Sequence, residues 1–245
     1  MPVNYPKLKF QISVKRDIDT FWVFANEADF DDGMGLEWAV FGHHPFFKRY
    51  KKGDTLKVED KIVKNYVEKL YKREKKEIEK NLIVFEKKWQ NIENKYYGLV
   101  DEFFNSEYWP KGRYICYPTI WGMYPRFLED KTFQVPFKHR NKRFVNVVIA
   151  HEMLHFVFYE YLFKKSSRYR ADKHTFFVWH VSEIFNSVVQ NSPEWMKLFK
   201  CNTMDYPEHE KIIKKLQKKY YKTCDWQVDS FIDNIFQEIR DNNLT

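Results

Sequence analysis

The segment at residues 148–158, VIAHEMLHFVF, constrains the fold of this chain more than any other feature. It is apolar enough to lie in a protein core, yet two histidines and a glutamate stand at its centre, where burial without a partner is costly. A helix turns about 100° per residue, so His151 and His155 project from one face, one turn apart. A buried helix with such a face is suited to holding a ligand between two imidazoles.

The surroundings of this segment predict a core helix rather than a membrane span. The window at 144–163 has the length of a span, but it carries His151, Glu152, His155 and Glu160 and stands alone in a hydrophilic chain. Apolar side chains flank the motif at Phe144, Val147, Val148, Leu154, Phe158 and Leu162. We therefore expect a buried helix and no membrane span.

The pattern His-Glu-x-x-His has a chemical logic on a helix. Neutral imidazoles one turn apart can both bind one Zn²⁺ at about 2.1 Å, and the adjacent Glu152 then lies beside the metal. The metal lowers the pKa of its bound water to about 7, and a carboxylate there can pass the proton to a leaving amine. We expect one zinc per chain, with Glu152 as general acid and base. The alternative is a coincidence of composition, with both histidines buried and hydrogen-bonded.

A catalytic zinc needs a third protein ligand and an open position. Candidates follow in the helical pattern at 171–190, where His174, His180 and Glu183 carry suitable atoms. At 100° per residue, His180, Glu183 and Ser187 share a face apart from the apolar stripe of that helix. Such a face could border a cleft or be plain solvated surface.

Two short apolar runs, at 113–117 and 131–137, predict strands before the motif helix. Pro136 has no N–H for a ladder bond, so the second strand is expected at a sheet edge. A free edge can pair with an extended peptide, which makes Phe133, Gln134 and Val135 candidates for binding substrate. An ordinary edge strand shielded by Pro136 is the alternative.

The order of edge strand, His151-Glu152-x-x-His155 helix and glutamate-bearing helix resembles the gluzincin branch of zinc metallopeptidases, the thermolysin-like group, over residues 113–190. The resemblance implies that His151 and His155 are the first two ligands, Glu152 the general base and Glu183 the third ligand. It also implies supporting contacts from Asn186 or Ser187.

The spacing departs from the family pattern. In many gluzincins the glutamate follows the second histidine after about eighteen or nineteen residues. Here His174 stands at the eighteen-residue gap, and Glu183 follows after twenty-seven. We favour Glu183, because His174 begins its helix beside Asp172 and Lys173, where a surface role is the default. His180 remains a rival ligand.

The rest of the chain predicts a mixed architecture. Residues 7–16 alternate as a strand would, and 60–104 predict one long amphipathic helix or two in tandem. Further helices are expected at 142–163, 171–190, 207–221 and 226–241. We divide the chain into an N-terminal strand, loop and helical region (1–106), a zincin-like core (107–200) and C-terminal helices packing on the core (201–245).

Charge and cysteine content narrow the function classes. The net charge is +8, but lysines alternate with acidic and apolar residues, as on solvated helix faces, so we do not expect nucleic acid as a partner. Cys116, Cys201 and Cys224 are odd in number and far apart, which favours a reducing compartment. No signal-peptide pattern is visible at the N-terminus, so a cytoplasmic location is expected. The oligomeric state is left open.

These observations predict an α+β protein: a small sheet with an edge strand beside two zinc-ligating helices, wrapped by N- and C-terminal helices. The expected activity is zinc-dependent hydrolysis of a peptide or protein substrate. One alternative is a zinc-stabilised binding or scaffold protein whose peptidase-like site is inactive or blocked. Another is a basic nucleic-acid-binding helical protein with an accidental motif.

Overall fold

The computed structural model describes residues 5–26, 37–52, 55–104, 108–165, 176–223 and 226–244. The fold is mixed α+β and mostly helical with a small sheet, which confirms the predicted class. The chain forms two compact units, each described by itself. The sheet unit comprises Leu8–Lys87 and Arg113–Val145, and the helical unit comprises Met1–Lys7, Lys88–Gly112 and Asn146–Thr245. This division differs from the three consecutive segments of the sequence analysis, because each unit combines stretches that are distant in sequence.

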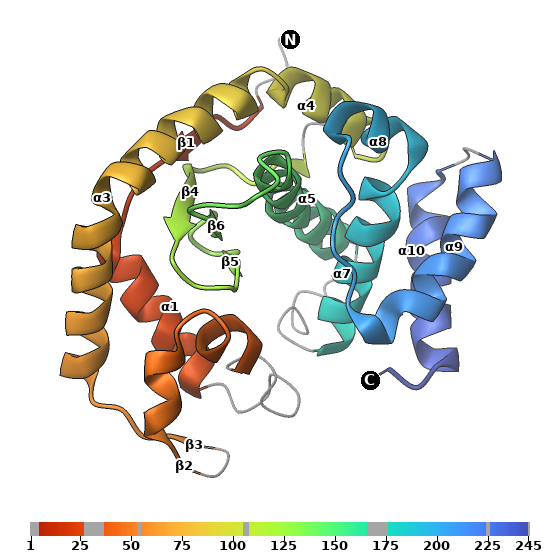
Figure 1. The fold of residues 1–245 in the computed structure, drawn as a ribbon. Helices are drawn as coiled ribbons and strands as arrows, with labels where there is room; N and C mark the ends of the chain where they lie inside the picture. Colours follow the sequence, from red (N-terminus) through yellow and green to blue (C-terminus); the bar gives the residue numbers. More distant parts are fainter. Residues whose placement is uncertain are drawn as a thin grey trace. The chain divides into compact units, whose positions relative to one another are not determined.

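The sheet unit is built on a four-stranded sheet with the order β1-β4-β6-β5 (Figure 1). The pairs β1–β4 and β4–β6 are parallel, and β5–β6 is antiparallel. A separate two-stranded hairpin joins β2 and β3. The strands are β1 (Leu8–Phe10), β2 (Lys51–Lys52), β3 (Thr55–Leu56), β4 (Tyr114–Thr119), β5 (Arg126–Phe127) and β6 (Thr132–Pro136).

The prediction of an edge strand at 131–137 is wrong. β6 lies between β4 and β5, because the chain turns back after β4 to form the short β5 against Thr132 and Phe133. The backbone N–H of Gln134 also donates to the carbonyl of Pro125 at 3.0 Å, and all five residues of β6 are buried. Pro136 is tolerated because it ends the strand, beyond the β5 pairing. Phe133 and Gln134 therefore offer no free edge to a peptide, and Val135 is fully buried.

The predicted strand at 7–16 ends early, at Phe10, and a helix that we did not predict follows. α1 (Val14–Asn26) begins after Ser13, whose hydroxyl accepts a hydrogen bond from the backbone N–H of Arg16 at 3.1 Å. This is an N-cap, and a serine before an apolar-periodic stretch was a visible signal for it. α1 delivers Phe21 to a core shared with the helical turns η2 (Glu37–Phe41) and η3 (Pro45–Tyr50).

A buried carboxylate ties the sheet unit together. Asp17 on α1 has no exposed surface. It accepts hydrogen bonds from Gln134 Nε2 at 2.6 Å, the Tyr71 hydroxyl at 2.8 Å and the backbone N–H of Ile120 at 3.0 Å. These donors are neutral, so burial dominates and raises the pKa of Asp17 to about 6. The bonds join α1 to α3 (Asp60–Gln90), to β6 and to the turn after β4.

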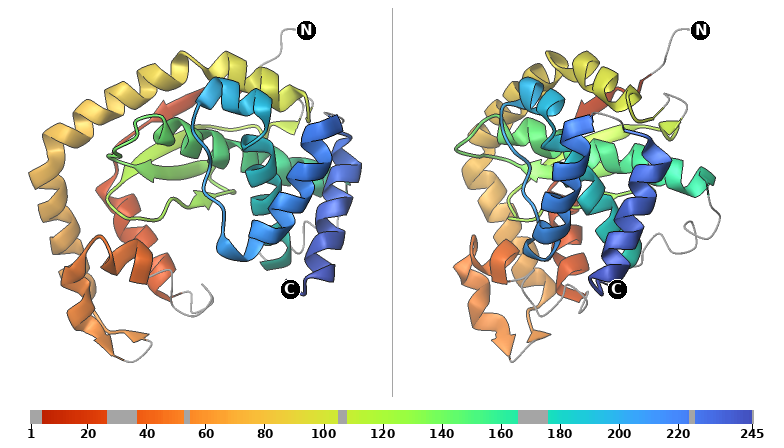
Figure 2. Two further views of the ribbon diagram at one scale, coloured as in Figure 1. Left: turned by 45° about the vertical axis from the view of Figure 1, so that its right-hand side comes forward. Right: turned by 90° about the vertical axis from the view of Figure 1, so that its right-hand side faces the viewer.

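The helical unit packs aromatic side chains between its helices. Phe158 lies 4.8 Å from Phe185, which lies 5.3 Å from Phe231, measured between ring centroids. These rings join α5, α7 and α10, and both views of Figure 2 show α9 beside α10. The helices are α4 (Glu93–Asp101), α5 (Phe144–Lys165), α7 (Phe176–Gln190), α8 (Pro193–Phe199), α9 (Glu210–Thr223) and α10 (Val228–Asp241), with the short turn η5 (Pro207–His209) before α9.

Most of these helices follow the predicted pattern. α3 and α4 are the tandem form of the pattern at 60–104, and the structure has helices where 142–163, 207–221 and 226–241 predict them. We did not predict α8, although Ser192 followed by Pro193 is a helix-start signal. Across the described helices, none is both long enough and apolar enough to span a lipid bilayer.

Candidate metal centre

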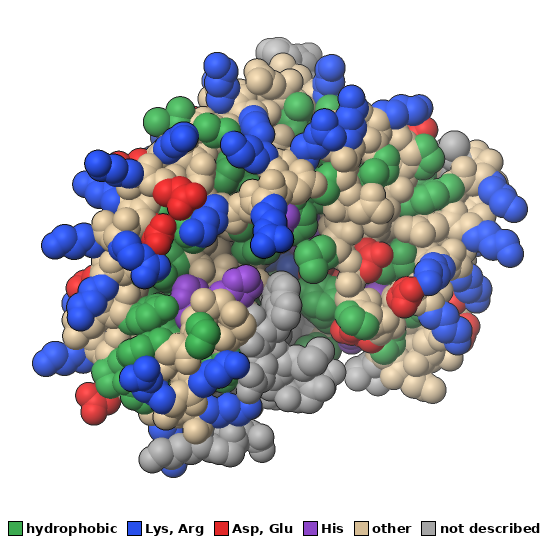
Figure 3. Space-filling model, viewed as in Figure 1, with side chains coloured by type: hydrophobic (Ala, Val, Ile, Leu, Met, Phe, Trp, Pro, Cys, Tyr) green, Lys and Arg blue, Asp and Glu red, His purple; other side chains and the backbone are tan. Residues whose placement is uncertain are grey.

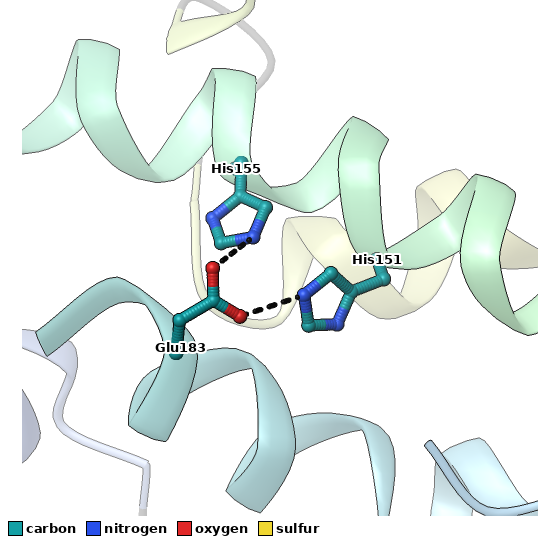
Figure 4. A group of neighbouring side chains, drawn as sticks. All are labelled: His151, His155 and Glu183. Carbon is teal, nitrogen blue, oxygen red and sulfur yellow. Dashed lines mark hydrogen bonds and ion pairs between the residues drawn. The ribbon is translucent and has the colours of Figure 1, made fainter. Parts of the chain in front are cut away.

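Two helices of the helical unit bring His151, His155 and Glu183 together (Figure 4). His151 Nε2 lies 3.0 Å from Glu183 Oε2, and His155 Nε2 lies 3.3 Å from Glu183 Oε1. One ligand atom from each residue lies within 4.8 Å of the others. In a tetrahedral zinc site with bonds near 2.1 Å, donor atoms are about 3.4 Å apart, so small adjustments suffice. The three residues could hold a metal ion.

The local sequence explains this arrangement. His151 and His155 are four residues apart on α5, and their ring centroids are 4.7 Å apart. On α7, the apolar residues Ile184, Phe185 and Val188 are fully buried. Glu183, three or four residues before Asn186 and Ser187, lies on another face of that helix. Packing of the apolar faces therefore turns the carboxylate of α7 toward the imidazoles of α5.

The cluster is nearly closed to solvent. The exposed fractions are 0% for the side chain of His155, 4% for that of Glu183 and 13% for that of His151. Burial alone would raise the pKa of Glu183, but the charges and hydrogen bonds of His155 and His151 hold that pKa well below its usual range. Burial likewise opposes the protonation of His151, yet the bond to Glu183 leaves the pKa of His151 raised. An ionised carboxylate between two imidazoles can exchange their protons for a cation.

Residues beyond the three ligand candidates also contact His151. Gln190 Oε1 lies 2.7 Å from His151 Nδ1, and Gln190 Nε2 donates to the carbonyl of Val147 at 3.2 Å. The Asn186 side chain donates to the backbone carbonyl of His151 at 3.0 Å. The Thr203 hydroxyl is 3.5 Å from His151 Nδ1.

We expected Asn186 or Ser187 to support the ligands and did not predict a contact from Gln190. Asn186 contacts the backbone of His151 rather than its ring. Ser187 forms a hydrogen bond with Asp205 instead. Burial raises the pKa of Asp205, and the hydrogen bond from Ser187 offsets part of this rise. Gln190 follows Glu183 by seven residues, which is about two helical turns, so the two residues lie on the same face of the helix. This spacing could have identified Gln190 from the sequence.

Glu152, the residue expected to carry protons, is 6% exposed on α5 beside His151. Burial lowers the pKa of His151, and Glu183 raises it. The negative charge of Glu152 also raises this pKa, by less than Glu183 does. The Glu152 carboxylate therefore lies near the ligand candidate His151.

The rival ligands are placed differently. His180 Nδ1 lies 2.7 Å from His209 Nε2, and the ring of Trp179 packs against both histidines. Glu183 and not His180 joins the two histidines of α5 in the metal-binding group found among the described residues. His174 lies outside the described residues.

Comparisons with known proteins assign no family to this chain. Neither protein-family models, nor curated proteins, nor solved structures match this chain.

The basic side chains do not gather in one patch on the face that Figure 3 draws. Lys and Arg side chains are spread over this face, with apolar, acidic and neutral groups between them.

Proposed function

We propose that this protein is a zinc-dependent metallopeptidase of the gluzincin type. The observation that carries the proposal is the meeting of His151, His155 and Glu183 from two helices, with Glu152 adjacent to the first histidine. Two imidazole nitrogens and one carboxylate form a ligand set that catalytic zinc uses, and it leaves a fourth position for water or substrate.

In this proposal each residue has a separate task. Zinc, when bound, supplies an activated water and polarises the carbonyl of the scissile amide. His151 and His155 present their Nε2 atoms, and Glu183 contributes a carboxylate that the charges and hydrogen bonds of the two histidines keep ionised against the effect of burial. Glu152 takes a proton from the attacking water and delivers it to the leaving amine.

A second candidate function is a zinc-stabilised binding or scaffold protein without turnover. The near-complete burial of the three ligand side chains favours it, since a purely structural metal needs no access for substrate. The two candidates share the metal and differ in hydrolysis. Glu152 favours the peptidase, because a structural site has no catalytic need for an acid and base beside the metal.

The first test is zinc per chain, measured by elemental analysis of protein purified without added metal and without a metal-binding tag. We expect close to one zinc per chain. Absence of zinc, with no uptake on titration, would contradict both candidates.

The second test separates the two candidates through Glu152. In Glu152→Gln, zinc should remain bound while hydrolysis of unfolded proteins or peptide libraries falls by roughly 10²- to 10⁴-fold, because only the proton carrier is lost. Glu160→Gln is the matched control, since Glu160 lies on the same helix and pairs with Lys164 at 3.5 Å. It should keep both zinc and activity. Equal rates for Glu152→Gln and wild type would rule out the mechanism, and zinc without any wild-type hydrolysis would select the scaffold.

A further inference from the structure

We propose that Gln190 is a positioning residue for the metal centre, whose carboxamide holds the His151 ring with its hydrogen on Nδ1 and its Nε2 toward Glu183. The inference rests on the proposed function as far as the metal is concerned. The orientation of the ring stands on contacts within the chain.

The two partners of the Gln190 carboxamide determine its orientation. The carbonyl of Val147 can only accept a hydrogen bond, so the group of Gln190 that faces it at 3.2 Å must be the NH₂. The oxygen of Gln190 then faces His151 Nδ1 at 2.7 Å. Because that oxygen can only accept, Nδ1 must carry the hydrogen. Gln190 is 2% exposed, so water does not compete for these bonds.

The hydrogen on Nδ1 determines which nitrogen of the His151 ring can bind a metal. A neutral imidazole has one nitrogen with a hydrogen and one with a free lone pair. Without a metal, Nε2 also carries a hydrogen, which it donates to the ionised carboxylate of Glu183 at 3.0 Å. With the other hydrogen held on Nδ1, Nε2 is the nitrogen that gives up its proton and offers a lone pair to a metal. The other tautomer would set a lone pair against the oxygen of Gln190 and present an N–H to the metal.

Two other polar side chains near His151, those of Thr203 and Asn186, do not replace Gln190. The Thr203 hydroxyl is 3.5 Å from Nδ1, which is too long for a strong hydrogen bond. Asn186 reaches the backbone carbonyl of His151 and leaves the ring free to turn. Gln190 is thus the residue through which α7 sets the orientation of a ligand candidate on α5.

Two variants separate positioning from a merely structural role. Gln190→Leu loses both hydrogen bonds, whereas Gln190→Glu keeps the acceptor for His151 and loses the donor to Val147. Gln237→Leu is the control, because Gln237 bonds to Asp241 on exposed α10 surface. The dissociation constant for Zn²⁺ is measured by competition with a chelator, and the melting temperature of each metal-free variant is recorded beside it.

We expect Gln190→Leu to bind Zn²⁺ roughly 10- to 100-fold more weakly than wild type, the usual cost of losing such a partner. Gln190→Glu should bind within a few-fold of wild type even where its melting temperature falls as far as that of Gln190→Leu, and Gln237→Leu should match wild type. Affinities that follow the melting temperatures, or an unchanged affinity in Gln190→Leu, would overturn the inference.

A spectroscopic measurement keeps this inference separate from the metal proposal. In ¹⁵N-labelled protein, the Nδ1–H proton of His151 should be hydrogen-bonded and slow to exchange in wild type, and lost in Gln190→Leu. If wild type takes up no Zn²⁺ but shows this signal, the metal proposal fails and the positioning of the ring by Gln190 holds. If the signal is absent, or unchanged in Gln190→Leu, the inference about Gln190 fails whatever the metal does.

Discussion

Two buried carboxylates, Asp17 in the sheet unit and Glu183 in the helical unit, respond to burial in opposite ways. Both have almost no exposed surface, and burial alone would raise the pKa of each. Burial raises the pKa of Asp17 to about 6, because the hydrogen bonds from its neutral donors lower that pKa by less than burial raises it. Glu183 lies between two imidazoles, so its pKa falls well below the usual range. The partners, and not the depth of burial, decide the sign.

The partners also decide what each carboxylate can do. Tyr71, Gln134 and the backbone N–H of Ile120 hold Asp17 through hydrogen atoms that are not available for exchange with a cation. His151 and His155 hold Glu183 through nitrogens that can give up a proton and bind a metal instead. The hydrogen bonds of Asp17 join two helices to the sheet, whereas the group around Glu183 could hold a metal ion.

The largest expected effect is on metal affinity. Glu183→Gln should weaken Zn²⁺ binding by roughly a thousandfold, beyond the 10- to 100-fold cost of losing an outer partner, because an anionic ligand is removed. Titration with a competing chelator measures it. Asp17→Asn is the matched change at the other buried carboxylate and should leave the affinity within about twofold of wild type. Equal losses in the two variants would mean that the comparison reflects general destabilisation.

The next effect is on stability against pH. The folded-state pKa of Asp17 is raised from 3.8 to about 6, so the folded protein binds this proton more tightly than the unfolded chain does. Protonation of Asp17 therefore contributes about 3 kcal/mol to the free energy of unfolding below pH 4, and this contribution is lost as pH rises through 6. Denaturant unfolding of wild type and Asp17→Asn across this range isolates it. A difference that stayed constant with pH would show that the pKa is not raised.

The smallest effect comes from a single donor to Asp17. Tyr71→Phe should cost about 1 to 2 kcal/mol of unfolding free energy at pH 8, where the carboxylate is ionised, and less at pH 4. Tyr161→Phe removes a hydroxyl whose partner, Asp229, is 63% exposed, and its cost should be under about 1 kcal/mol. Equal costs in the two variants would show that burial does not strengthen the Tyr71 bond.

The sequence predicted elements that local pattern defines and missed those that depend on neighbours. The amphipathic repeat at 60–104 and the apolar run around His151 appear in the structure as α3, α4 and α5. The interior place of β6 could not be predicted, because Pro136 suggested an edge while the partner strand β5 is only two residues long. Helix α1 was missed because alternation in 7–16 extended past the Ser13 cap.

The sequence by itself determined that His151 and His155 share one face of a helix, since a four-residue spacing is a property of the helix alone. Only the tertiary structure decided what meets them. Glu183 and His180 lie three residues apart on α7. Packing of that helix against α5, where Phe185 contacts Phe158, and against α10 sets its rotation and distance. This packing brings the carboxylate to the two rings and leaves His180 with His209. The same packing delivered Gln190 to His151, a contact across 39 positions of sequence that no local pattern encodes.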